Sequence, residues 1–123
     1  MGNIRSSVSQ FKLNSAASTN ATLIKAGTGQ IYSIAVSGHH ATLARYLKVY
    51  DNAVAPTVGT TIPILTVGAP PLTTTTNTAV HLNFGTFGIS YTNGLAIAIT
   101  GVGTDADATA VALGDLKVVI SYA

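Results

Sequence analysis

The 123-residue chain is 47% hydrophobic and only 8% charged, carries a net charge of +2 and contains no cysteine. An average soluble domain has about 25% charged residues, so little of this surface requires water, and we expect part of it to contact protein. The length suits one compact domain and leaves little room for two. The four acidic residues are all aspartates; glutamate, which helix surfaces favour, is absent, so the composition argues against a helical bundle.

The scarcity of charge also limits the partners and the location that we expect. The six basic residues are spread along the chain, whereas a nucleic-acid-binding surface needs them clustered. No apolar run approaches the roughly 18 residues of a membrane span, and residues 1–10 are polar, so we expect neither a membrane segment nor a signal peptide. The lack of cysteine fits a protein that works, or is assembled, in a cytosol.

The first third of the chain predicts an arm followed by three strands. Residues 1–10 are polar and are expected to form a flexible N-terminal arm. Residues 11–26 can supply two strands around a turn at 18–20, with their register left open. Residues 30–37 alternate along the chain with the period of a strand.

Residues 41–50 fit either a strand or an amphipathic helix. Their aromatic and β-branched residues, with glycine and proline nearby, favour the strand. As a strand, the segment sends Arg45 and Leu47 to one face, and Tyr46 and Lys48 to the other. Arg45 is therefore expected to reach for a carboxylate or a carbonyl across a strand or subunit boundary.

Arg45, Tyr46 and Lys48 are the interface candidates of the sequence. They form a cluster of amphipathic side chains, and arginine and tyrosine are enriched at protein interfaces. The alternative is that they are ordinary side chains on the surface of a strand. Both interpretations stand at this point.

Five more short apolar or alternating runs predict strands at residues 60–67, 79–84, 88–91, 95–100 and 116–122. Pro63 lacks a backbone N–H, which predicts that its strand lies at a sheet edge. Asn93 and Gly94 both tolerate positive φ, so they predict a tight type I′ hairpin between the strands on either side. The threonine run at 73–76 is expected to be an extended surface loop; the alternative is that it reaches over a neighbouring subunit.

These runs together define the expected fold class. They give about eight short strands separated by turn residues, with almost no helix, which is typical of an all-β protein. We expect one antiparallel β-sandwich domain of jelly-roll type over residues 1–123. A chain of this length buries roughly 65–70% of the surface that it exposes when unfolded, so neither a metal nor a disulfide is needed to stabilise it.

The chain offers few groups for catalysis or for binding a metal. An active site needs several titratable side chains that converge, and the sequence supplies three histidines and four aspartates. No Ser-His-Asp order, nucleophile elbow or phosphate-binding loop is present, so we expect neither an enzyme nor a cofactor. Asp105 and Asp107 are weak candidates for a calcium site, because they place two carboxylates at alternate positions. The rest of an EF-hand loop is missing, and an Asx-type turn is favoured.

The three histidines have structural interpretations. His39 and His40 are adjacent, and adjacent side chains of an extended chain point to opposite faces, so they indicate a polar turn. A symmetry axis could still bring copies of one of them together at a metal or a pH-sensitive contact. His81 shares a strand face with Asn83 and is expected to be partly buried and hydrogen-bonded.

Two segments of the chain resemble a known group of proteins. Residues 44–66 read ARYLKVYDNAVAPTVGTTIPILT: a strand that ends in an aromatic residue and Asp, an alanine-rich turn, the sequence Pro-Thr-Val-Gly, and a strand that contains proline. Residues 88–123 combine a glycine-flanked hairpin, an Asp-x-Asp loop, a Gly-Asp turn and a terminal strand with tyrosine. Both segments resemble small β-rich virion structural proteins of tailed bacteriophages.

The resemblance implies a virion component that is assembled in the host cytoplasm. It favours a capsid cement or decoration protein, which would bind the major capsid protein on the outer shell as a homotrimer and stabilise the shell. The alternative is a tail or baseplate protein that adheres to a host receptor or glycan, with Tyr46, Tyr50 or Tyr91 as stacking platforms. In neither case do we expect a nucleic acid, a membrane or a cofactor as partner.

Overall fold

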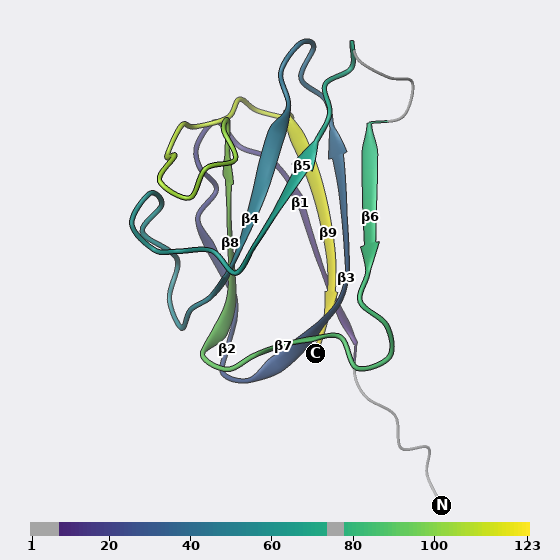
Figure 1. The fold of residues 1–123 in the computed structure, drawn as a ribbon, viewed down its shortest axis with the longest axis vertical. Coiled ribbons are helices and arrows are strands. Elements are labelled where there is room, and N and C mark those ends of the chain that lie inside the picture. Colours follow the sequence, from purple (N-terminus) through teal and green to yellow (C-terminus); the bar gives the residue numbers. More distant parts are fainter. Residues whose placement is uncertain (1–7, 74–77) are drawn as a thin grey trace, which may run out of the picture.

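The computed structural model describes residues 8–73 and 78–123 and shows two β-sheets packed face to face (Figure 1). Within these residues there is no helix, and so none that could cross a membrane. The expected antiparallel β-sandwich is confirmed. Its nine strands are β1 (Ser9–Asn14), β2 (Thr22–Ala26), β3 (Gly29–Gly38), β4 (Arg45–Asp51), β5 (Leu65–Ala69), β6 (Ala79–Asn83), β7 (Ile89–Tyr91), β8 (Gly94–Thr100) and β9 (Leu116–Tyr122).

The chain follows the winding of a jelly roll. One sheet has the order β1-β9-β3-β6, with β7 pairing to the start of β3, and the other has the order β2-β8-β4-β5. Every pair is antiparallel, and early strands pair with late strands in reverse order: β1 with β9, β2 with β8, β3 with β6, and β4 with β5. The chain is therefore a long ribbon that is folded over into two sheets.

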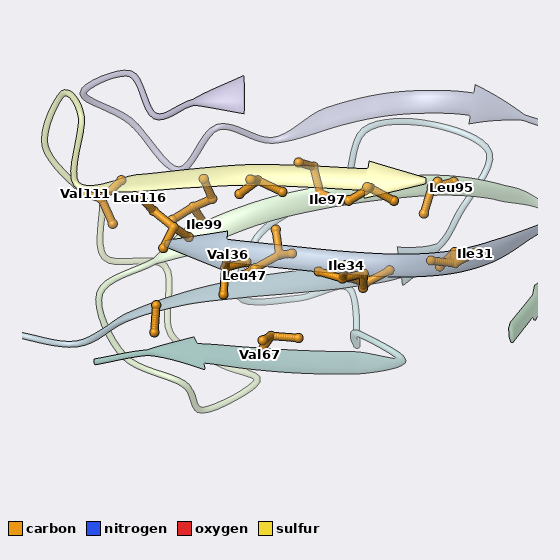
Figure 2. Close-up of a cluster of buried hydrophobic side chains, with 14 of the residues drawn as sticks. Ile31, Ile34, Val36, Leu47, Val67, Leu95, Ile97, Ile99, Val111 and Leu116 are labelled. Carbon is orange, nitrogen blue, oxygen red and sulfur yellow. The ribbon is translucent and has the colours of Figure 1, made fainter. Parts of the chain in front are cut away.

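The core lies between the sheets and is built from the inward side chains of each (Figure 2). Ile34 of β3 and Leu47 of β4 come from opposite sheets and are both fully buried in it, and burying one such side chain contributes about 1.5–3 kcal/mol. A register shift between Ile31 and Ser33 interrupts the alternation of β3. As a result Ile31 lies in the core with Ile34, whereas strict alternation places Tyr32 there and is wrong at this point.

The centre of the four-stranded sheet, formed by β4 and β8, is buried on both of its faces. Lys48 and Tyr50 of β4 point away from the core, yet both are fully buried. Two loops cover this outer face: residues 52–64, between β4 and β5, and residues 101–115, between β8 and β9. Val58 of the first loop packs against the cluster around Tyr50, and Lys48 bonds to the second loop.

Several strand limits differ from the prediction. Ser9 and Gln10 belong to β1 and pair with β9, so the expected arm does not extend through residue 10. Residues 1–7 of that arm lie outside the described residues, as do residues 74–77, which include most of the threonine run. Pro63 precedes β5 and is not part of it, and β5 is an edge strand as predicted.

The predicted hairpin at Asn93 and Gly94 is wrong. β7 joins the five-stranded sheet and β8 the four-stranded sheet, so the chain crosses between sheets here. Neither residue has the positive φ that a type I′ turn needs. Gly94 is required for a different reason, because a Cβ atom there would collide with the carbonyl oxygens of Asn52 and Lys25. The pairing of β8 with β2 and β4 outweighs the local turn preference.

Gly94→Ala is expected to destabilise the fold by on the order of 1–3 kcal/mol, because the added methyl group must displace backbone atoms. Equilibrium unfolding in urea measures the change. Ser90→Ala, which alters an exposed side chain on β7, is the control and should shift the free energy of unfolding by less than about 0.5 kcal/mol. An unchanged unfolding midpoint for Gly94→Ala would contradict the close approach.

Candidate functional site

Arg45, the first of the three interface candidates, forms an ion pair within its own chain. Its side chain is 12% exposed, and its Nε donates a hydrogen bond to Oδ2 of Asp115 at 2.9 Å. Burial alone would raise the pKa of Asp115, but hydrogen bonds from the Ala112 N–H and from Arg45, with the charges of Arg45 and His40, lower it. The carboxylate that Arg45 was expected to reach thus lies just before β9, in the other sheet.

Lys48 anchors the loop between β8 and β9. It is fully buried, and its Nζ donates hydrogen bonds to the carbonyl oxygens of Thr104 at 2.7 Å and Asp107 at 2.9 Å. A buried ion costs several kcal/mol unless such partners offset the loss of water. Because its ammonium group is enclosed in this way, Lys48 offers no charge to a partner protein.

Tyr46, the third candidate, is partly buried. Its ring lies against Gly68 of β5 and against Gly103, where an added Cβ atom would come within 2.8 and 2.9 Å of ring carbons. These two glycines form a slot for the half-buried ring. Tyr46 also borders a shallow groove between the β3–β4 and β8–β9 loops, which is lined by Leu43, Ala44, Arg45, Tyr46, Gly101, Val102 and Thr109.

The carboxylate of Asp51 closes the turn between β7 and β8. Its oxygens accept hydrogen bonds from the backbone N–H groups of Thr92, Asn93 and Gly94, at 2.7 to 3.3 Å. These bonds, above all that from Thr92, lower the pKa of Asp51. Asp51 therefore fixes the point at which the chain crosses between the sheets.

The two calcium candidates differ in their surroundings. The carboxylate of Asp107 accepts hydrogen bonds from the Val102 N–H and from both the N–H and the hydroxyl of Thr109. Burial would raise the pKa of Asp107, but the bonds from Thr109 and Val102 outweigh it and lower the pKa. Asp105 is exposed. Across residues 8–73 and 78–123, no three histidine or aspartate side chains converge as a metal ion would require.

The histidines occupy two separate places. His39 Nε2 lies 2.9 Å from the hydroxyl of Ser37, and His40 Nδ1 accepts hydrogen bonds from two backbone N–H groups of the β3–β4 turn. Both histidines thus serve a polar turn. His81 is exposed on β6, and the expectation that it is partly buried is wrong, because β6 is an edge strand with one face open to solvent.

Two of the three tyrosines suggested as glycan platforms are buried. Tyr91 is 2% exposed and donates its hydroxyl hydrogen to the carbonyl oxygen of Ala123 at 2.7 Å. Tyr50 is fully buried, and its hydroxyl finds no hydrogen-bond partner among the described residues. Burial and the charge of Asp105 raise the pKa of Tyr50. Neither ring can stack on a sugar, so this part of the adhesion hypothesis is wrong.

Within residues 8–73 and 78–123, the outer face of the five-stranded sheet has no comparable cover. Cross-strand pairing arranges its outward side chains in rows across β1, β9, β3 and β6, and none of these side chains is buried. Since β3 contributes only serine and alanine here, the centre is flat. The rows, called the open face below, are Gln10, Ser121, Ser33 and Asn83; Lys12, Val119, Ala35 and His81; and Asn14, Lys117, Ser37 and Ala79.

The open face carries charge of one sign. Lys12 pairs with Val119 and Lys117 with Asn14, so the two lysines are diagonal neighbours, a relation that places Cα atoms roughly 7–8 Å apart. Both are exposed, and they flank a shallow hollow between β1 and β9. No aspartate lies in the rows. Sequence reasoning missed this pair because only the register of β1 against β9 brings the lysines together.

Comparison with known proteins adds no relative: no protein-family model matches the chain, and no curated protein sequence matches it. Function has therefore to be inferred from the molecule itself. Its two distinguishing features are the loop-covered four-stranded sheet and the open face of the five-stranded sheet.

Lys48→Met is expected to destabilise the protein by roughly 1.5–3 kcal/mol, because charge-assisted hydrogen bonds are lost and two carbonyl oxygens are left unpaired. Amide hydrogens of the β8–β9 loop should also exchange faster with deuterium. Tyr50→Phe is the matched control from the same face: it removes a hydroxyl that lacks a partner among the described residues, so stability should hold or rise. Unchanged unfolding and exchange in Lys48→Met would refute the anchoring role.

Acid is expected to weaken the fold below about pH 5. The pKa values of Asp51, Asp107 and Asp115 are all lowered in the folded protein. A carboxylate of this kind stabilises fully above its unfolded pKa of about 3.9, and the contribution is lost as the pH falls through the folded pKa. Urea unfolding at neutral and acidic pH tests this. Asp51→Asn should reduce the acid sensitivity, with Asp105→Asn, which removes an exposed carboxylate, as the control.

Proposed function

We propose that this chain is a structural protein of a tailed-phage virion, specifically a capsid cement or decoration protein that binds the major capsid protein on the outer shell as a homotrimer. The observation that carries the proposal is the contrast between its two sheets. Buried Lys48 and the Arg45–Asp115 pair hold the loops and the sandwich together, while the five-stranded sheet presents a flat face that none of the described loops covers. Such a molecule is suited to lie against another surface.

The resemblance to phage virion proteins falls on one part of the fold. Residues 44–66 form β4, the loop that covers it and the start of β5, and residues 88–123 form β7, β8 and β9 with the second covering loop. The resembling segments therefore include most of the covered sheet and both loops over it. This supports a shared way of building a stable subunit, which a shell protein needs.

Weak contacts are sufficient for the proposed role. A specific interface buries about 1,600 Å² in total, and a trimer that engages several capsid subunits at once gains avidity beyond the affinity of each contact. The β4–β5 loop exposes Val54, Ile62 and Ile64, which offer apolar surface for contacts between copies around a threefold axis. Many such subunits would add to the strength of the shell.

Difference cryo-electron microscopy of particles with and without the protein is the direct test. We expect density over the shell with threefold symmetry, and light scattering should give the mass of a trimer, in solution or on addition of shells. Density confined to the tail would replace this proposal with the adhesion role. Absence from the particle would reject both, and a monomer under all conditions would reject the trimer.

A further inference from the structure

We infer that the open face is a docking surface for an acidic protein surface, with Lys12 and Lys117 as the residues that engage the partner's carboxylates. The inference rests on the proposed function and deepens it, because it identifies which face of the subunit meets the capsid and the chemistry of the capsid surface there.

The first argument is that these two lysines have no ionic role in the fold. In the described chain, Arg45 is paired with Asp115, Lys48 is buried against backbone carbonyls, and Lys25 donates to the carbonyl oxygen of Thr28. Lys12 and Lys117 are exposed, and nothing in the described residues bonds to their ammonium groups. The two described lysines without a hydrogen-bond or ionic partner therefore lie on one sheet face.

The second argument is the geometry of the pair. Diagonal neighbours of like charge on adjacent strands repel each other, and a carboxylate seated between them relieves that repulsion. The hollow that Lys12 and Lys117 flank is also lined by Asn14, whose amide can donate a hydrogen bond to the same group. Beside it, the short side chains of β3 allow another backbone or side chain to approach closely.

The third argument concerns which class of molecule binds the open face. A second copy of this chain cannot supply the acidic groups, because Asp51, Asp107 and Asp115 bond within the chain and only Asp105 is exposed among the four aspartates. Nucleic acid is disfavoured, because the rows of the open face hold only two lysines, whereas binding to a phosphate backbone needs clustered cations. A different protein with exposed carboxylates is the partner that fits.

The test is rebinding to shells that lack the protein. Wild type is compared with the double variant Lys12→Gln/Lys117→Gln and with the control Ala21→Glu/Ala26→Glu, which changes the net charge equally on exposed residues at the two ends of β2, in the other sheet. We expect the lysine variant to bind at least about tenfold more weakly, the control to bind like wild type, and added salt to weaken wild-type binding. Superimposable unfolding curves would show that all three proteins fold equally well.

The outcomes separate this inference from the proposed function. If wild type and the lysine variant bind shells equally, the open face is not the docking surface and the capsid role stands. If wild type does not bind shells, the capsid role fails, and an NMR titration of the ¹⁵N-labelled protein with poly-L-glutamate decides the inference. Shifts confined to the open face, lost in the lysine variant, would support it. Shifts that include Lys25 equally, or a stronger response to duplex DNA, would overturn it.

Discussion

The burial of the Lys48 ammonium group is the constraint on which the covered half of the molecule depends. A cation without water needs oxygen atoms around it, and the carbonyls of Thr104 and Asp107 reach it only when the β8–β9 loop folds back over the sheet. In that position the loop meets the other cover, since Ala106 lies against Gly59 of the β4–β5 loop. One charged side chain thus determines how both loops close over the sheet.

The two sheets of the sandwich differ in whether their outer face is covered or exposed to water. The outer face of β4 and β8 is largely apolar around Lys48, with Tyr50, Ala96 and Ala98 fully buried, so it must be covered, and the chain uses its scarce ionic groups to hold the cover in place. β3 has serine and alanine on its outer face, which tolerate water and need no cover. A domain with so little charge uses Lys48 and the Arg45–Asp115 pair to hold its covered half together. The open face is the one that we assign to a partner.

The strands were predictable where the signal is local. Alternation alone defined β9 at the residues observed, and it placed Arg45 and Lys48 on opposite faces of β4. It could not show that Lys48 is buried, because alternation gives the face of a strand and not what lies over that face. The prediction of a hairpin at Asn93 and Gly94 was wrong for a related reason, because pairing with the distant strands β2 and β4 determines which sheet β8 joins. The open face could not be predicted from the sequence, because it depends on the register between strands that lie far apart along the chain.

The ribbon that folds into the two sheets also dictates when the subunit can form. Ser9 pairs with Tyr122, so β1 has no partner until the last strand has left the ribosome, and among the described strands only β4 and β5 pair with a neighbour next in sequence. The chain loses conformational entropy on closing long loops before such distant contacts can stabilise the fold, so folding of this topology is slow. During that interval apolar strands such as β8 are exposed and prone to pair with other chains. Completion of β9 is therefore the step that converts a vulnerable nascent chain into a folded domain.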